Sequence, residues 1–284
     1  MIPEYTYSRI ASDNRIADKD KEAILNLFKV SDSISFGKIG PRQEGYIWLG
    51  VGYPRATNVL QMDGMRAAAL MEWAKTQVAN RIEFELVQKL HDNGEIGLGD
   101  IGVACKEGLA DPDRQKNEAA DVGTFEHDNI ENWLNGVSEY TENEILRRFV
   151  EIWSKERVVL VCTEMPLIYR DPETGHGFGG KLDILAYKDG KFYIYDNKTS
   201  KSVHNSYGQQ VSAYKNAVEQ MSGGRIKIEK CKIIHLPDLT TLKEWQLKQY
   251  KKLGSLIECK NMDEAFVHYK ILLEQYYRRN NKYF

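Results

Sequence analysis

Residues 179–201 read GGKLDILAYKDGKFYIYDNKTSK, and the fold that we expect follows from this stretch. Two short apolar segments, 181–187 and 191–197, flank a turn that contains Asp-Gly. An Asp-Gly pair between two such segments is typical of a tight β-hairpin. The stretch therefore predicts two neighbouring antiparallel strands.

Charged residues interrupt the apolar pattern at one end of this hairpin. Side chains alternate between the two faces of a strand, so Asp196 and Lys198 share one face of the second strand. Asp183 comes from the neighbouring strand. Two acidic groups and a lysine suit a cleft better than an apolar core, so we expect the three to converge. The alternative is an exposed ion pair between Asp196 and Lys198 at a frayed strand end, which would contribute little.

The remaining sequence predicts helices before this hairpin and alternating strands and helices after it. Apolar residues at helical spacing indicate helices, and β-branched apolar runs indicate strands. The expected helices are 19–30, 63–91, 113–134 with an interruption near Gly123, 141–155, 205–221 and 263–278; the further expected strands are 158–169 and 226–236. This order predicts an α/β (α+β) fold class with a helical N-terminal half. We expect a helical region at 1–110, packed on a core at 111–284.

Length and composition indicate an ordinary globular protein. The chain has 284 residues, of which 42% are hydrophobic and 28% charged, and this excludes a disordered chain, a collagen or a coiled coil. No run approaches the ~18 apolar residues of a membrane-spanning helix, and the N-terminus lacks the apolar region of a secretory signal. We therefore expect a cytoplasmic protein with no membrane partner.

Cysteine spacing and charge narrow the chemistry further. The four cysteines lie far apart without a CxxC pair, so we expect no zinc site, iron–sulfur cluster or disulfide framework.

The net charge of −2 argues against a general nucleic-acid coat protein, but it hides an asymmetry. Residues 111–151 contain 11 Asp and Glu against 4 Lys and Arg, and residues 225–261 contain 9 Lys and Arg against 4 Asp and Glu. An acidic region can hold metal and a basic one can hold phosphate, although solvated helix faces explain most such charges.

The converging charges suit the hydrolysis of a phosphodiester bond. Two carboxylates can hold a hard divalent cation, which prefers oxygen ligands. Such a cation polarises the phosphate and lowers the pKa of a bound water. A lysine beside it can orient the nucleophile or stabilise the transition state.

Four further residues carry polar groups on helix faces or in a strand where apolar ones are expected. His127 shares an inward helix face with Ile130, so it is either a satisfied core histidine or a ligand. Glu164 lies in an otherwise apolar strand, where an unpaired carboxylate is costly, so it either pairs with a base or points into the cleft. Gln210 and Tyr214 lie one helical turn apart, which also fits an amphipathic helix with a buried tyrosine.

Four short motifs occur in order between residues 123 and 214. The central two are Gly180-x-x-Asp183 and Asp196-Asn197-Lys198-Thr199; residues 123–127 read Gly-Thr-Phe-Glu-His, and residues 210–214 read Gln-Val-Ser-Ala-Tyr. Together they resemble the PD-(D/E)XK nuclease superfamily, and most of all its RecB-like branch. Residues 53–60 and 70–73 more faintly resemble segments of phage RecB-like exonucleases and of mitochondrial genome maintenance exonucleases. Asn197 departs from the branch, which usually has an aromatic or aliphatic residue there.

This resemblance implies a restriction-endonuclease-like core, with a central mixed sheet flanked by helices, and it implies roles for individual residues. It implies His127, Asp183, Asp196 and Asn197 as metal ligands, Lys198, Asp183, Asp196 and Glu164 as catalytic residues, and Gln210 and Tyr214 as substrate-binding residues. Lys198 would be the base or charge stabiliser, and Asn197 would offer its backbone carbonyl. The metal would be Mg²⁺ or Mn²⁺, and no iron–sulfur cluster is expected. Glu131, one turn after His127, would orient that histidine.

The function that we expect is that of a metal-dependent deoxyribonuclease. The resemblance favours an exonuclease that acts on DNA ends, with single-stranded DNA as the expected partner, in a bacterial or phage-infected host cell. A replication or recombination protein as a further partner is not identified by the sequence. The alternatives are an endonuclease of the same fold, a catalytically silent DNA-binding or assembly subunit, and an RNA-processing nuclease. An intact set of two Asp and a Lys argues against the silent subunit.

Overall fold

The computed structural model describes residues 2–41, 43–138 and 143–280. Contacts divide the chain into two compact units. Met1–Met62 and Glu126–Phe284 form the first, here called the core unit, and Asp63–Phe125 form the second, here called the hairpin unit. The boundary that the sequence predicts near residue 110 falls inside the hairpin unit.

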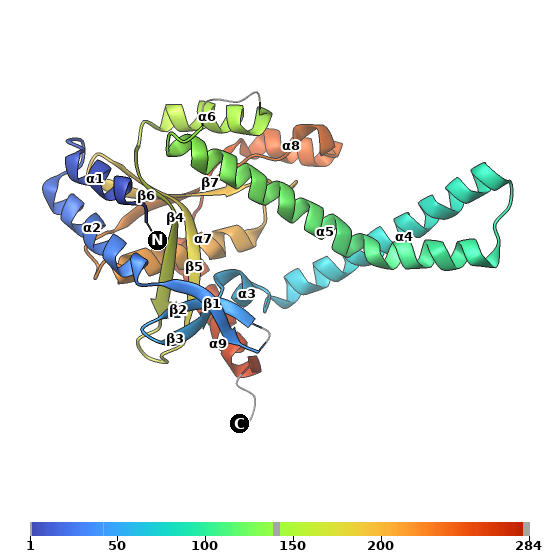
Figure 1. Cartoon of the computed structure of the whole chain (residues 1–284), viewed down its shortest axis with the longest axis horizontal. Coiled ribbons are helices and arrows are strands. Elements are labelled where there is room, and N and C mark those ends of the chain that lie inside the picture. The colour runs from blue at the N-terminus through green and yellow to red at the C-terminus, as the bar shows by residue number, and fades with distance from the viewer. Residues whose placement is uncertain (1, 42, 139–142, 281–284) are drawn as a thin grey trace. The chain divides into compact units, whose positions relative to one another are not determined.

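The core unit contains a five-stranded mixed sheet in the order β4-β5-β6-β7-β8 (Figure 1). Its strands are β4 Val159–Arg170, β5 Gly177–Lys188, β6 Lys191–Lys198, β7 Ile228–His235 and β8 Leu256–Glu258. The pairs β4–β5, β5–β6 and β7–β8 are antiparallel, and β6–β7 is parallel. A parallel pair needs a long crossover, and α7 (Asn205–Met221) supplies it between β6 and β7. The hairpin predicted around Asp189-Gly190 is confirmed as β5–β6.

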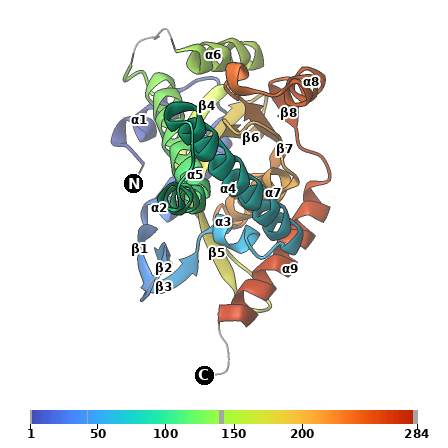
Figure 2. The same ribbon diagram turned by 90° about the vertical axis from the view of Figure 1, so that its right-hand side faces the viewer.

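Helices cover both faces of this sheet. On one face α7 packs against β4 and beside α9 (Met262–Asn280), as Figure 2 shows. Val211, Tyr214 and other residues of α7 belong to the larger hydrophobic cluster there. On the other face Ile130 and Phe149 pack on strand residues such as Tyr195 in a second cluster. The sheet is therefore buried between two helical layers.

The described helices outside α7 and α9 complete the chain. They are α1 Glu4–Ser12, α2 Asp18–Asp32, α3 Ala56–Leu60, α4 Gly64–Asn93, α5 Leu98–Leu134, α6 Glu144–Glu156 and α8 Glu244–Leu253, with a 3₁₀ turn at Leu239–Thr241. Glu126 at the core-unit end of α5 is joined to the start of α6, because the N-cap residue Asn143 donates to both carboxylate oxygens of Glu126 at 3.1 Å.

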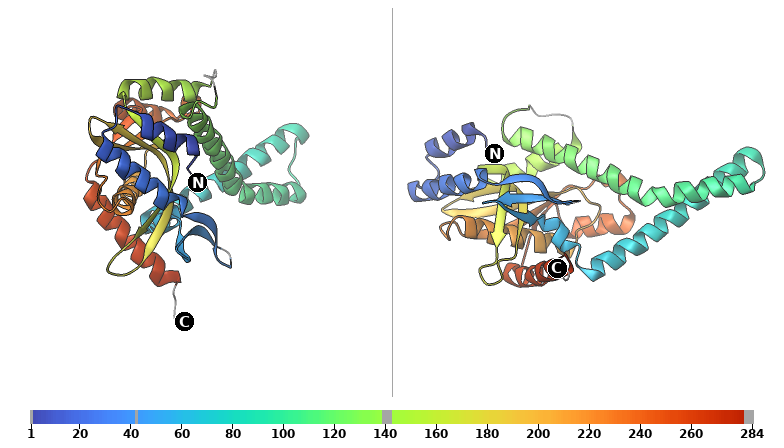
Figure 3. Two further views of the ribbon diagram at one scale, coloured as in Figure 1. Left: turned by 60° about the vertical axis from the view of Figure 1, so that its left-hand side comes forward. Right: turned by 60° about the horizontal axis from the view of Figure 1, so that its bottom comes forward.

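A small antiparallel sheet lies at the N-terminal end of β5. Its strands are β1 Ser35–Gly40, β2 Gln43–Trp48 and β3 Val51–Pro54. Strands β2 and β3 contact β5 (Figure 3, right). A bridge outside the named strands also joins Arg55 to Gly179. A Cβ at Gly179 would collide with Tyr46 of β2, so glycine permits this close approach. The sequence analysis does not predict this sheet.

The hairpin unit consists of α4 and the first part of α5, which run antiparallel. Asp63 caps α4 by accepting hydrogen bonds from the backbone N–H groups of Met65 and Arg66, and Gly94 ends it in the left-handed conformation at φ 75°. The two helices cross closely at Gly108, where an added Cβ would lie 2.5 Å from Cγ1 of Ile82.

The observed elements confirm the mixed α/β class and most of the predicted segments. The helix predicted at 205–221 is α7 with the same bounds, and the helix predicted at 63–91 is α4. The predicted interruption near Gly123 and the predicted start at residue 113 are wrong, because α5 runs without a break from Leu98. The sequence does not predict α1, α3, α8 or β8. Residues 141–142 of the helix predicted at 141–155 lie outside the described residues. Within the described ranges, the helices are too short or too polar to cross a membrane.

Candidate functional site

The predicted charged residues meet where β5 and β6 stop pairing. The last paired residues toward this end are Ile184 and Tyr195, so Asp183 and Asp196 lie just beyond the ladder. The backbone N–H of Asn197 donates to Oδ2 of Asp183 at 2.8 Å. A buried carboxylate thus replaces the backbone acceptor that the ladder would have supplied.

His127 reaches this point from the core-unit end of α5. Its Nε2 lies 3.1 Å from the carbonyl oxygen of Asn197, and its Nδ1 lies 3.6 Å from Oδ2 of Asp183. A carbonyl only accepts, so Nε2 carries the proton of this hydrogen bond and Nδ1 keeps its lone pair in the neutral ring. The ring therefore presents a free nitrogen toward the Asp183 carboxylate.

Glu164 completes a group of three possible ligands. Ligand atoms of His127, Glu164 and Asp183 all lie within 4.8 Å of one another. The backbone of Glu164 has φ 50°, which is uncommon for a residue that is not glycine and rare within a strand. Its carboxylate also forms an ion pair with Lys181 of β5. Backbone strain of this kind costs about 1–3 kcal/mol and concentrates at functional sites.

Asp196 and Lys198 form a buried pair beside this group. The Asp196 side chain is fully buried, the Lys198 Nζ lies 2.5 Å from its Oδ2, and its Oδ1 has no hydrogen-bond partner in the described part of the chain. Burial lowers the pKa of Lys198, but the charges of Asp196 and Asp183 outweigh it, so the pKa is raised overall. Lys198 is therefore a cation here, which suits a charge stabiliser better than a base.

The protonation of Asp183 is shifted by its place in the cluster. Burial, followed by the negative charge of Asp196, raises the pKa of the Asp183 carboxyl to about 7. His127 and Lys198 oppose this shift. Burial and the close approach of two carboxylates outweigh this opposition, so the protonated form of Asp183 is favoured.

Gln210 and Tyr214 border the same cluster from α7. The Gln210 side-chain amide donates to the Tyr214 hydroxyl at 3.0 Å, and the Tyr214 ring packs on Gly180, where a Cβ would lie 2.5 Å from it. Burial, and after it the charge of Asp196, raises the pKa of Tyr214 well above its usual value. Glycine at position 180 thus leaves room for the ring next to the strand that bears Asp183.

Three residues beside the cluster, Ser200, Tyr207 and His235, are not predicted from the sequence. The ring of Tyr207 lies 5.3 Å from the Lys198 Nζ, and its hydroxyl donates to Oγ of Ser200 at 2.7 Å. His235, paired with Lys198 across β6 and β7, lies 2.7 Å from the Ser200 carbonyl through Nε2. The spacing of Tyr207 from Gln210 and Tyr214 along one helix face is the signal that could have identified it.

The cluster brings the predicted residues into one place, with two differences in detail. Asp196 faces Lys198 and is not part of the three-residue ligand group, in which Glu164 takes its place among the described residues. Glu131, expected to orient His127, instead accepts a hydrogen bond from Thr163 at 3.2 Å, and the Asn197 carbonyl takes the orienting place beside the histidine. In the basic segment, residues 225–261, the Trp245 side chain is exposed. The Tyr250 hydroxyl forms hydrogen bonds with the Ser255 hydroxyl and with the Arg148 guanidinium.

Comparison with known proteins adds no assignment to this geometry. No family model matches the chain, and a search of curated proteins finds no match.

Proposed function

We propose that the protein is a divalent-metal-dependent nuclease that hydrolyses phosphodiester bonds in DNA. The observation that carries the proposal is the convergence of His127, Glu164 and Asp183 beside the buried Asp196–Lys198 pair. The order of motifs, which resembles the RecB-like branch of the PD-(D/E)XK superfamily, supports the same function. On that resemblance we also propose a restriction-endonuclease-like core for the sheet and its helices.

The donor atoms fit a hard divalent cation such as Mg²⁺ or Mn²⁺. Two atoms that both lie about 2.0–2.2 Å from one cation are at most about 4.4 Å apart, and Nδ1 of His127 and Oδ2 of Asp183 are 3.6 Å apart. The partnerless Oδ1 of Asp196 and the raised pKa of Asp183 are both features that a nearby positive charge would relieve. His127, Glu164 and Asp183 would hold the cation, with Asp196 as a further oxygen donor. The Asn197 carbonyl accepts from the opposite ring nitrogen of His127, so it would orient this ligand and would not bind the cation itself. The bound cation would supply Lewis-acid polarisation of the phosphate and a more acidic water.

The chain's own residues provide orientation and charge. Lys198, kept protonated by Asp196, would place a positive charge against the negative charge that develops on the phosphate. The Asn197 carbonyl fixes the His127 tautomer, so the ring would be ready to bind through Nδ1. Gln210 would contact the substrate phosphate from α7, and the buried Tyr214 would hold the Gln210 amide in place through their hydrogen bond.

A cleavage assay tests this proposal directly. Labelled linear and circular single-stranded DNA are incubated with the protein, with Mn²⁺ or with a chelator. We expect metal-dependent loss of linear DNA and survival of the circles, as for an exonuclease. Lys198→Ala should lose at least about a hundredfold in rate, the scale of losing one transition-state charge contact. It should retain the thermal stabilisation by Mn²⁺, because an ammonium is not a ligand.

Matched variants separate the site from the fold. Lys191→Ala changes an exposed lysine on the same strand, paired with Glu229, and should cleave like the parent. Asp183→Asn should lose both cleavage and stabilisation by Mn²⁺. Prompt linearisation of the circles would indicate an endonuclease, and preferential loss of a matched RNA would indicate an RNA-processing enzyme. Binding of DNA without any cleavage in Mn²⁺ or Mg²⁺ would reject the catalytic proposal in favour of a silent subunit.

A further inference from the structure

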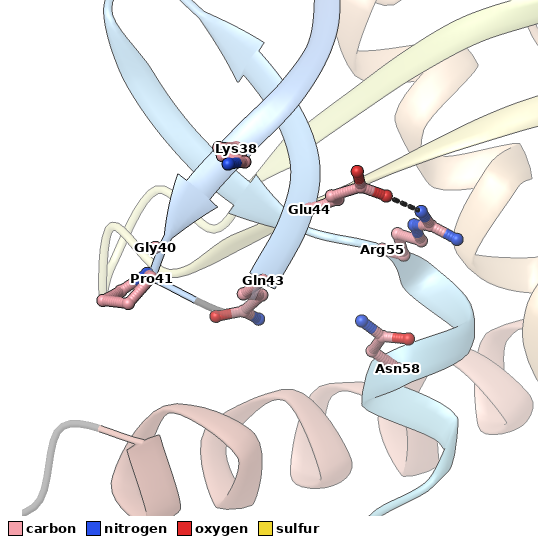
Figure 4. A pocket seen from close by; sticks show the side chains of 7 residues that line it. All are labelled: Lys38, Gly40, Pro41, Gln43, Glu44, Arg55 and Asn58. Atoms are coloured by element: carbon pink, nitrogen blue, oxygen red, sulfur yellow. Dashed lines mark hydrogen bonds and ion pairs between the residues drawn. The ribbon is translucent and has the colours of Figure 1, made fainter.

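A polar cavity lies in the core unit, outside the cluster described above. Its volume is about 430 Å³, within the range of roughly 300–1,000 Å³ that is usual for ligand pockets. Figure 4 shows it between the β1–β2 hairpin and the start of α3. The polar side chains that line it are Lys38, Gln43, Glu44, Arg55 and Asn58. Two cations, two amides and one carboxylate are suited to a small anion and not to an apolar ligand.

Arg55 is the most defined group in this cavity. Its Nη2 donates to Glu44 at 3.0 Å, and its guanidinium carbon lies 4.7 Å above the Phe36 ring. These two contacts fix the plane of the guanidinium. Its Nε is buried and has no hydrogen-bond partner among the described residues. A guanidinium has five N–H donors in a planar fork that matches phosphate oxygens, and the Glu44 bond uses only one of them.

The other polar groups add donors around the same space. Lys38 has no ion-pair partner and the Asn58 side chain has no hydrogen bond within the described ranges. The Gln43 amide donates to the Tyr276 hydroxyl of α9, which holds that side chain at the cavity wall. Because Glu44 is already paired with Arg55, the unpaired charge in the cavity is positive.

The cavity is connected to the proposed catalytic cluster along β5. Gly179, Lys181 and Asp183 are alternate residues of this strand. Arg55 bridges the first of them, Lys181 pairs with Glu164, and Asp183 belongs to the ligand group. Four residues of strand span roughly 13 Å, which is the scale of a few nucleotides of an extended strand.

A second cavity of about 310 Å³ shares one lining residue with the first. Asn58 lines both cavities, and Arg279 of α9 lines the second. A row of cations and amides that extends past one cavity suits a chain of phosphates better than an isolated small anion.

We infer that the cavity formed by Lys38, Gln43, Arg55 and Asn58 binds a phosphate group of the nucleic-acid strand whose cleavage occurs at the Asp183 cluster. The inference rests on the proposed nuclease function and adds a second contact that sets the register of the strand. The phosphate is either a terminal phosphate or an internal phosphodiester, since both present the same oxygens to Arg55.

Binding without hydrolysis tests this inference. The chelator-treated protein is titrated with short single-stranded oligonucleotides, labelled internally, that carry a 5′-phosphate, a 3′-phosphate or hydroxyls at both ends. Arg55→Gln should weaken binding by about tenfold or more, the scale of a charge-assisted hydrogen bond. Lys38 has no ion-pair partner among the described residues, so Lys38→Gln breaks no described ion pair. This variant should lower the slope of log affinity against log salt by about one. Lys191→Gln, another exposed lysine of the core unit, is the control and should bind like the parent.

Each outcome decides a separate question. If one phosphorylated end gives an advantage that Arg55→Gln removes, the site holds a terminal phosphate. If Arg55→Gln weakens all three oligonucleotides equally, it holds an internal phosphodiester. If the parent cleaves DNA and both cavity variants bind the oligonucleotides as tightly as the parent does, the phosphate site is rejected and the nuclease proposal stands. If the parent neither binds nor cleaves nucleic acid, both proposals fail together.

Discussion

The core unit and the hairpin unit depart from the usual distribution of polar and apolar residues in opposite directions. The core unit buries the carboxylates of Asp183 and Asp196 within its sheet. In the hairpin unit none of the residues of α4 is buried. Its exposed large apolar residues include Leu70, Met71, Phe84, Val87, Leu90, Leu98, Ile101 and Leu109. Buried charges and exposed apolar groups are the informative exceptions to ordinary burial.

The comparison shows that stability and function make different demands on the two units. Buried charge is costly unless it is paired, so the cluster in the core unit must be held by its surroundings. In the hairpin unit, small residues such as Ala104 and Gly108 are buried at the helix crossing, while large apolar side chains remain outside. We therefore expect the core unit to be destabilised most by substitutions that leave a buried charge without its partner. We expect the hairpin unit to be destabilised most by substitutions that enlarge a small side chain at the helix crossing.

The largest effect is expected from breaking the buried pair. Lys198→Met leaves the fully buried Asp196 without its partner, so the metal-free protein should lose about 3–5 kcal/mol in its free energy of unfolding. The double variant Lys198→Met/Asp196→Asn should recover most of this loss, because it also removes the Asp196 charge that lost its partner. Urea unfolding in a chelator measures both. The exposed pair between Lys191 of β6 and Glu229 of β7 is the control, and Lys191→Met should change stability far less than Lys198→Met does. Equal losses for the two lysines would show that burial of the pair has no energetic consequence.

A second effect depends on pH. The pKa of Asp183 is about 7 in the folded protein, above its usual value near 3.8. The folded state thus binds a proton that the unfolded state has already released, so this group's stabilisation is complete below about pH 4 and is lost as the pH rises through 7. Relative to Asp183→Asn, the metal-free parent should lose about 2–4 kcal/mol between pH 4 and pH 8. Parallel stability curves for the two proteins would contradict the assignment.

The local sequence predicts the helices and strands in which apolar residues recur at regular spacing. α7 and the hairpin of β5 and β6 have regular apolar spacing, and alternation along the strands is enough to bring Asp183 toward Asp196. The sheet β1–β3 is not predicted, because most of its residues are not buried and show no regular alternation. The left-handed backbone of Glu164 and its pairing with Lys181 arise from tertiary contacts that no local pattern records.

The smallest effect tests the helix crossing in the hairpin unit with two glycines of the same helix. An Ala Cβ at Gly108 would lie 2.5 Å from Cγ1 of Ile82 and 3.0 Å from the Val78 carbonyl oxygen, whereas at Gly102 it would have no atom within 4 Å. Replacing glycine by alanine inside a helix gains about 0.5–1 kcal/mol when there is room, so Gly102→Ala should stabilise α5. Gly108→Ala should instead destabilise the pairing of α4 and α5 by about 1–2 kcal/mol, because the helices must separate.

Amide hydrogen exchange resolved by residue measures both changes within the hairpin unit. Gly108→Ala should raise exchange rates across α4 and the first turns of α5, and Gly102→Ala should lower them near its own position. Neither variant touches the Asp183 cluster, so the stabilisation of the core unit by Mn²⁺ should match the parent in both. Faster exchange in both variants alike would mean that the close crossing at Gly108 does not hold the hairpin together. Slower exchange in Gly108→Ala would mean that the helices have room for a side chain there, and that their exposed apolar residues, more than the crossing, decide how the hairpin packs.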